Sequence, residues 1–328
     1  MFIFSETAFH HEGDVNFLNN LINESKKSLA QGVKFQVLFD INSFISKKNS
    51  NYSLVQKSII SKEDWKEAFL KTNGLNLKVI IMPCDNKVVE SVIKDELFTD
   101  FLEIHSIMYN DYKFLQLIKD SAIPIILSIG GRNITEINEK INFFGDQIYC
   151  LMVGFQAFPT KISDINIEKI NTLKRMYPKL NIGYADHCDF SEERQFDINL
   201  HAFRLGADVF EKHITFNEGV IRTDYISAVG GKKFKRLVKK LDTQKERYDK
   251  IFDADLNFMS ESEIIYRNRQ KCCVINKSKK LGEIIYDDDV DLKMTNSIGI
   301  SSVDKVIGKK LLKNVYKDDT INKDYLDN

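Results

Sequence analysis

Residues 181–214 read NIGYADHCDFSEERQFDINLHAFRLGADVFEKHI, and this stretch predicts one repeat of the fold. The runs at 181–185 and 209–214 have the length and the apolar composition of buried strands. Between them, residues 190–205 place apolar side chains at helical spacing. A helix there would return the chain so that the second strand runs parallel to the first.

The same alternation of a short apolar run and a longer helical segment recurs along the chain. Eight such runs are found, at 2–9, 33–39, 77–82, 101–106, 124–129, 148–155, 181–185 and 209–214. Eight strand-and-helix units in about 240 residues match the size of a TIM barrel. An open doubly wound sheet is the alternative, but no GxGxxG follows the first run, and eight units favour closure.

The barrel pattern stops well before residue 328. We expect a barrel domain over 1–250, a polar helical connection over 251–269 and a β-rich module over 270–328, where short strands surround a Lys-Lys-Leu-Gly-Glu turn. A module of that size buries little surface alone, so we expect it to dock on something else.

Composition excludes several classes of partner. The 328 residues carry 47 Lys and Arg against 47 Asp and Glu, so no basic footprint for nucleic acid or an anionic membrane is expected. The first residues lack the pattern of a signal peptide, and no run approaches 18 apolar residues. Five cysteines without metal-site or disulfide spacing favour a cytoplasmic location.

Two histidines at the ends of neighbouring predicted strands are candidate metal ligands. His187 and His213 follow the seventh and eighth runs, and chemistry in a TIM barrel is expected at that end of the strands. Glu6 or Glu211 would add an oxygen ligand to a divalent ion that polarises a carbonyl group. The alternative is that the two imidazoles only pack and hydrogen-bond at the top of the barrel.

Lys34 lies within a buried run, where an unpaired ammonium group is costly, so it must meet an anion. It would either neutralise a structural carboxylate such as Asp85, or bind a substrate phosphate or carboxylate together with Ser106 and Ser128. Gln36 points to the same side as Lys34 and would hydrogen-bond a sugar hydroxyl.

At these residues the chain resembles the N-acetylneuraminate (sialic acid) synthase family. The stretches that carry the resemblance are ETAFHHEGD, VKFQ, FQAFPT, IGYADH, GADVFEKHIT and RTDYIS, and the tail with LGEIIYDDDVDLK is similar to the family's antifreeze-like (SAF) domain. This implies a TIM barrel followed by a β-clip-like SAF domain. It also implies a homodimer in which each SAF domain covers the partner's active site.

The resemblance implies a reaction as well: phosphoenolpyruvate adds to the aldehyde of an open-chain N-acylhexosamine, and phosphate leaves to give a nonulosonic acid for a surface glycan. His187 and His213 would hold Mn²⁺ or Mg²⁺, and Glu6 would lie by the metal or handle a proton. The remaining site residues would bind the two substrates: Lys34, Ser106 and Ser128 the phosphoenolpyruvate, and Gln36, Gln156 and Asp224 the sugar.

Several positions depart from the family pattern inside the expected site. A phosphate-binding Lys and a sugar-binding Glu of the fourth strand correspond to Glu103 and Met108, and further changes fall at Ala185, Gln156, Phe158 and near Met294. Three hypotheses therefore stay open. The chain is a synthase of altered specificity, a metal-dependent aldolase or lyase that does not use phosphoenolpyruvate, or a non-catalytic sugar-binding member of the family.

Overall fold

The computed structural model describes residues 1–154, 157–251 and 259–327 of the chain. The chain divides into two compact units, Met1–Ile251 and Phe252–Asn328, which we call the barrel unit and the C-terminal unit. Each is described by itself below.

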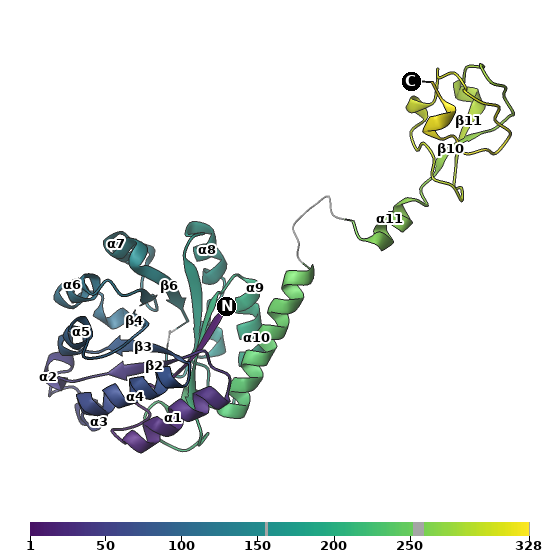
Figure 1. Ribbon diagram of the computed structural model, residues 1–328. Coiled ribbons are helices and arrows are strands. Elements are labelled where there is room, and N and C mark those ends of the chain that lie inside the picture. Colours follow the sequence, from purple (N-terminus) through teal and green to yellow (C-terminus); the bar gives the residue numbers. More distant parts are fainter. Residues whose placement is uncertain (155–156, 252–258, 328) are drawn as a thin grey trace. The chain divides into compact units, whose positions relative to one another are not determined.

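The barrel unit is built on a closed ring of eight parallel strands (Figure 1). The strands are β1 (Phe2–Glu6), β2 (Gly32–Val37), β3 (Lys78–Pro83), β4 (Phe101–Ile104), β5 (Ile125–Ser128), β6 (Ile148–Val153), β7 (Asn181–Asp186) and β8 (Val209–Thr215). Strand β1 pairs with both β2 and β8, and this double pairing closes the ring. The predicted TIM barrel is therefore confirmed, and the open-sheet alternative is wrong.

The inside of the ring changes from apolar to charged along the strands. Phe4, Ile80, Ile126 and Val209 are fully buried and pack together inside the barrel. Side chains of a strand alternate between its two faces, so the next inward position lies two residues further on. Glu6, Ser128 and Glu211 occupy those next positions, which places polar groups at the carboxyl ends of the strands.

Helices surround the ring, and Figure 1 shows them on its outside. They are α1 (Val15–Lys27), α2 (Ile41–Phe44), α3 (Tyr52–Lys57), α4 (Lys62–Gly74), α5 (Asn86–Ile93), α6 (Tyr112–Asp120), α7 (Ile134–Phe144), α8 (Lys169–Met176), α9 (Gln195–Arg204) and α10 (Gly231–Ile251). A large apolar core lies between strands and helices, with Trp65, Phe35 and Phe69 in ring contact. Side-chain caps start several helices; Asn133 and Glu136 form a capping box on α7.

The C-terminal unit contains a short helix and two paired strands. Helix α11 (Glu261–Arg267) precedes β10 (Cys272–Ile275), which pairs antiparallel with β11 (Val290–Lys293). A small core of eight buried apolar residues, including Cys273, Ile285 and Leu311, holds this unit together. Asp289 is buried there and pairs with Lys277 at 2.8 Å and also with Lys279.

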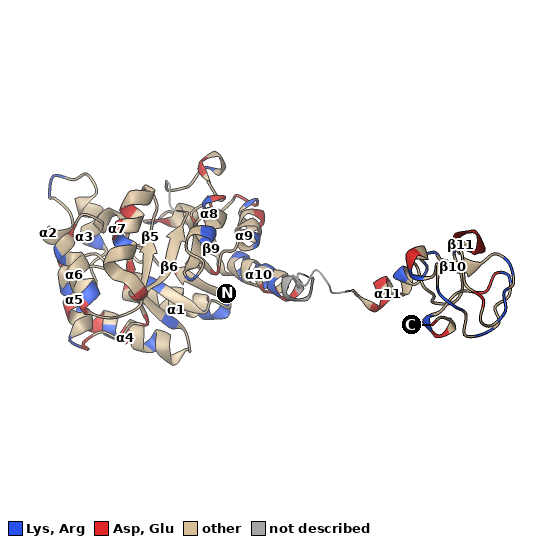
Figure 2. Ribbon diagram, turned by 90° about the horizontal axis from the view of Figure 1, so that it is seen from above, with Lys and Arg blue, Asp and Glu red and all other residues tan. Residues whose placement is uncertain are grey.

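The outer helices of the barrel unit carry charges of both signs, as the blue and red segments of Figure 2 show. This mixture agrees with the equal numbers of acidic and basic residues in the sequence. A short strand, β9 (Val229–Gly230), pairs in parallel with the last two residues of β8, Ile214 and Thr215. Within the described ranges, no helix is long and apolar enough to cross a membrane.

Candidate functional site

A cavity of about 290 Å³ opens at the carboxyl ends of the barrel strands. It is lined by eight of the nine residues that the sequence singles out for catalysis or binding: Glu6, Lys34, Gln36, Ser106, Ser128, His187, His213 and Asp224. The ninth, Gln156, lies outside the described residues. The fold therefore brings together side chains that are separated by up to 218 positions in sequence, from Glu6 to Asp224.

Lys34 lies at the centre of a group of buried carboxyl groups. Its ammonium nitrogen is 2.8 Å from Glu211 Oε2, 3.0 Å from Glu103 Oε1 and 3.1 Å from Glu6 Oε2. All four side chains are at most 3% exposed. An ammonium group at this depth needs counter-charges because burial disfavours a lone ion, and here the protein itself supplies three.

Two neighbouring hydrogen bonds fix the orientation of these carboxyl groups. Ser128 Oγ donates to Glu103 Oε1 at 2.8 Å, so that oxygen receives both the Ser128 hydroxyl and the Lys34 ammonium. Gln36 Nε2 donates to Glu6 Oε1 at 2.8 Å. Lys34 and Ser128, two of the three residues expected to bind phosphoenolpyruvate, are thus both engaged by Glu103.

The environment shifts the pKa values of the three carboxyl groups in different directions. Burial alone would raise the pKa of Glu6, but the charge of Lys34 and the contact with His213 outweigh it and hold that pKa well below its usual value. Burial raises the pKa of Glu103 and Glu211, more strongly for Glu211, although Lys34 opposes the rise. Glu6 is therefore ionised at neutral pH.

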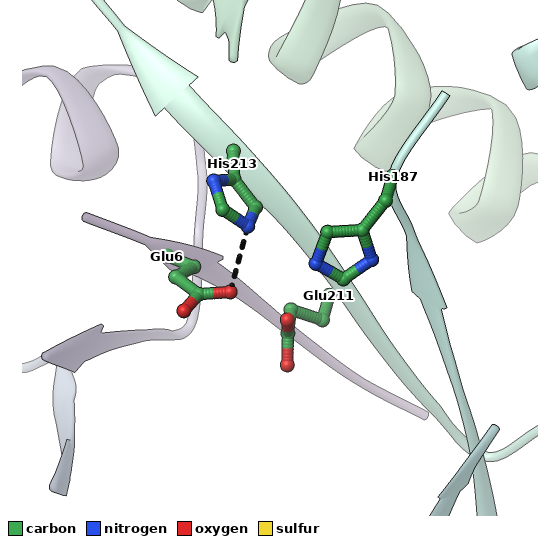
Figure 3. A group of neighbouring side chains, drawn as sticks. All are labelled: Glu6, His187, Glu211 and His213. Carbon is green, nitrogen blue, oxygen red and sulfur yellow. Dashed lines mark ion pairs between the residues drawn. The ribbon is translucent and has the colours of Figure 1, made fainter. Parts of the chain in front are cut away.

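Four side chains at the top of the cavity form a candidate metal site, and Figure 3 shows them pointing toward one another. Glu6, His187, Glu211 and His213 offer ligand atoms that lie within 4.8 Å of one another. His213 Nε2 lies 2.9 Å from Glu6 Oε2, the contact marked by the dashed line in Figure 3. The rings of His187 and His213 meet at 4.9 Å between centroids.

The chemistry of this group fits a divalent ion. Burial holds the pKa of His187 well below its ordinary value, so its imidazole is neutral and has a lone pair to donate. Glu211 Oε1 is buried and has no hydrogen bond in the described part of the chain, so it is available to an ion. Glu211 Oε2 and His213 Nε2 are in ion-pair contact with Lys34 and Glu6, at 2.8 and 2.9 Å. Two imidazoles and two carboxylates form the mixed nitrogen and oxygen set that Mn²⁺, Fe²⁺ or Zn²⁺ accepts.

The loop that carries His187 is fixed by buried groups behind it. Asp186 Oδ1 accepts from the Cys188 amide at 2.9 Å, and Asp186 Oδ2 accepts from Asn199 at 2.8 Å. Lys212 donates to the Cys188 carbonyl at 3.0 Å. Gly154 lies against the same loop, with a φ of +125°; a Cβ there would come within 2.3 Å of the Ala185 carbonyl oxygen, so glycine is required.

The loop after β1 holds Asp224 at the cavity wall. Asp224 adopts a left-handed backbone with φ +62° and accepts from the Phe9 amide at 3.2 Å. Arg222 donates to the carbonyls of His10 and His11 at 2.9 and 3.0 Å. His10 contacts Thr223 and Thr215, and His11 packs edge-on against Trp65. These two strand-end histidines support the loop and do not line the cavity.

One suggested partner of Lys34 is wrong. Asp85 accepts hydrogen bonds from the backbone amides of Phe39, Asp40, Lys87 and Val88, so it caps helix α5 and ties it to the loop after β2. Four amide donors already satisfy this carboxylate, and its place at a helix N-terminus favours a negative charge. The carboxylates that neutralise Lys34 are those of Glu6, Glu103 and Glu211.

The role of Glu103 as a partner of Lys34 was missed in the sequence. Lys34, Glu103 and Glu211 lie on β2, β4 and β8, and inward side chains of alternate strands form the layers inside a TIM barrel. That layering rule could have identified Glu103 as a partner of Lys34. To apply it, the register of each strand must be known, and the sequence pattern alone defines the register only to within a residue or two.

The chain is similar to known proteins over nearly its whole length. The sequence pattern of the NeuB family matches residues 21–251. An N,N′-diacetyllegionaminic acid synthase from Campylobacter jejuni is 28% identical, covering 97% of this chain and 98% of the relative. An N-acetylneuraminate-9-phosphate synthase from Homo sapiens is 22% identical, covering 100% and 93%. A solved N-acetylneuraminic acid synthetase from Leptospira borgpetersenii, in complex with citrate, is 26% identical with a TM-score of 0.72, covering 81% and 91%.

Proposed function

The chain belongs to the NeuB family, and we propose that it is a sugar-acid synthase that joins a three-carbon donor to the aldehyde carbon of an open-chain, N-acylhexosamine-like sugar. The product would be a nonulosonic-type 2-oxo acid. The observation that carries this proposal is the group of two histidines and two glutamates at the top of the barrel cavity, beside the buried Lys34. Similarity to synthases of sugar acids over 96–100% of the chain supports it.

Phosphoenolpyruvate is the donor that the family resemblance implies. In this form of the proposal its C3 bonds to the aldehyde carbon, water attacks C2, and phosphate leaves. Lys34, Ser106 and Ser128 line the same cavity and would be the contacts for the donor's anionic groups. The reaction forms one carbon–carbon bond, so the enzyme would be a transferase of the synthase type.

A second candidate uses a donor without phosphate, as an aldolase does. The observation that favours it is the carboxyl group of Glu103, which already receives hydrogen bonds from Lys34 and Ser128. A phosphate group would have to displace Glu103 from both donors. The sugar and the metal would keep the same places in either candidate.

The residues of the cavity have separable tasks in this reaction. Glu6, His187, Glu211 and His213 would hold a divalent ion, Mn²⁺ or Mg²⁺, which supplies a Lewis acid for the aldehyde oxygen. Glu6 is ionised and can accept a proton at its oxygens. Gln36 orients Glu6 through its side-chain amide. It also lines the cavity and would hydrogen-bond a sugar hydroxyl. Asp224, held by the Phe9 amide, would accept a hydrogen bond from the sugar.

The C-terminal unit would act as a SAF domain in a homodimer and cover the partner's cavity. Several large apolar side chains of this unit are exposed, among them Leu281, Met294, Ile298 and Tyr316, each above 60%. Exposed apolar surface on so small a unit is typical of a docking face. Light scattering should give twice the mass of one chain, and Met294→Asp should weaken that association without unfolding the barrel unit.

The direct test is product formation. Purified protein with Mn²⁺ is incubated with either phosphoenolpyruvate or pyruvate and a panel of hexosamines with different N-acyl and deoxy substituents, and 2-oxo acid products are identified by mass spectrometry. A sugar-dependent product supports the synthase function, and phosphate release shows that phosphoenolpyruvate is the donor. No product from any pair, with folded and metal-loaded protein, would contradict the proposal and leave the non-catalytic alternative.

A further inference from the structure

One anion-binding position in the cavity is already filled by the protein itself. Glu103 Oε1 lies 3.0 Å from Lys34 Nζ and 2.8 Å from Ser128 Oγ, and the Glu103 side chain is 2% exposed. A hydroxyl and an ammonium group that converge on one oxygen form the contacts that an external phosphate or carboxylate oxygen would use. We call this position, made by Lys34 and Ser128, the inner anion seat.

The charge of the cavity makes it difficult for a second anion to share this seat. Among the described residues that line the cavity, Lys34 is the only lysine, and there is no arginine. Four of these lining residues have carboxyl groups: Glu6, Glu103, Glu211 and Asp224. Three of the four contact the same ammonium group. Beside the Lys34 ammonium, the Glu103 carboxylate holds both donors of the seat more strongly than a neutral amide would. An incoming phosphate therefore gains little there and meets like charges nearby.

We infer that Glu103 is the residue that determines the donor, and that it selects a 2-oxo acid of the pyruvate type over a phosphorylated enol. This inference rests on the proposed synthase function and specifies its three-carbon substrate. A pyruvate-type donor has a single negative charge and no phosphate, so Glu103 can remain in the inner anion seat and keep its hydrogen bonds from Lys34 and Ser128. Its own carboxylate and carbonyl oxygens would use the metal side of the cavity and the Ser106 side of its wall.

The reaction balances without a leaving group. A carboxylate of the group around Lys34 accepts a proton from the methyl carbon of the donor, and the resulting enolate carbon forms a bond to the aldehyde carbon of the sugar. The aldehyde oxygen receives the proton as the carbonyl π electrons move onto it. Water is not consumed and phosphate is not released, so the product is a 4-hydroxy-2-oxo acid that retains every atom of both substrates.

Binding measurements test the inference independently of turnover. Pyruvate, phosphoenolpyruvate and inorganic phosphate are each titrated by calorimetry into Mn²⁺-loaded wild-type protein, Glu103→Gln and Glu103→Lys. Glu139→Gln, an exposed carboxylate on α7, is the matched control. We expect the wild type to bind pyruvate at least about tenfold more tightly than phosphoenolpyruvate. In Glu103→Gln and Glu103→Lys, affinity for phosphoenolpyruvate and phosphate should rise about tenfold or more, and in Glu139→Gln it should not change.

The outcomes separate this inference from the function on which it rests. Wild-type protein that prefers phosphoenolpyruvate, or a Glu103→Gln variant that binds it no better, would overturn the role of Glu103, while a sugar-dependent product from phosphoenolpyruvate would keep the synthase function. If no donor gives a product with any sugar, the synthase function fails, and the wild-type titrations still decide the donor preference. These wild-type titrations also decide it if the Glu103 variants do not fold.

Discussion

The ammonium nitrogen of Lys212 lies 3.4 Å from Asp186 Oδ1, and the two side chains are 1% and 0% exposed. Lys212 is flanked on β8 by Glu211 and His213, which face the cavity, so its own side chain points to the opposite, helix-covered side. Asp186 directly precedes His187. This buried pair therefore joins the ends of β7 and β8 behind the two histidines of the candidate metal site.

Loss of the Lys212–Asp186 pair should weaken metal binding. Replacing Asp186 by Asn keeps the volume but removes the charge that faces Lys212, and it loosens the turn that carries His187. Supporting contacts of metal-binding histidines typically contribute 10–100-fold to metal affinity, so we expect a loss of about tenfold or more in Mn²⁺ affinity by calorimetry. Glu193→Gln, an exposed carboxylate nearby in sequence, should bind Mn²⁺ as the wild type does.

Removal of either histidine should abolish tight binding of Mn²⁺. His187→Ala and His213→Ala each delete one of four converging ligands, and the remaining carboxylates stay paired with Lys34. Electron paramagnetic resonance of added Mn²⁺ should show free ion in both variants and bound ion in His201→Ala, whose imidazole is exposed on α9. Bound Mn²⁺ that persists in His187→Ala and His213→Ala would show that the metal binds elsewhere.

Replacement of Lys34 should destabilise the barrel in a pH-dependent way. Lys34→Met leaves Glu6, Glu103 and Glu211 buried without their cation, and breaking a buried ion pair from one side costs about 3–5 kcal/mol. Protonation of the carboxyl groups relieves part of this cost at low pH, so the loss should be larger at pH 8 than at pH 6. Urea unfolding at the two pH values measures it.

A double-mutant cycle checks the cause of that loss. If the uncompensated carboxylates are responsible, Lys34→Met combined with Glu103→Gln should be less destabilised than the sum of the two single changes. Additive effects, or a loss that does not depend on pH, would argue that Lys34 contributes through packing of its side-chain methylenes instead.

The sequence predicts the strands better than it predicts the partners of the charged side chains. Apolar runs and their spacing are local features, and all eight predicted strands are present. The pairing of Lys34 with Glu103 depends on the register of β2 and β4, which are alternate strands and do not contact each other in the sheet. Asp85 also follows a strand, but its carboxylate accepts hydrogen bonds from backbone amides at the start of α5 and so caps that helix instead of pairing with Lys34.

His10 and His11 should make the folded barrel unstable in acid. Both side chains are buried, and burial is the main cause that lowers the pKa of His10 to about 4 and of His11 to about 3, from 6.5 in the unfolded chain. Between these values the unfolded chain binds more protons than the folded one, so stability is complete above about pH 6.5 and falls as the pH decreases toward 4. With about 1.4 kcal/mol for each pKa unit, His11 alone would account for a few kcal/mol.

The His11→Asn variant tests this explanation. Its side-chain oxygen can still accept from the Gly13 amide, which now donates to His11 Nδ1, but it does not titrate in this range. The variant should be less stable at pH 7, because the smaller side chain leaves a cavity beside Trp65, and should lose less stability than the wild type between pH 6.5 and 4. His201→Asn, at an exposed position, should follow the wild-type curve. Urea unfolding at half-unit pH intervals compares the three proteins, and an unchanged slope in His11→Asn would assign the acid lability to other groups.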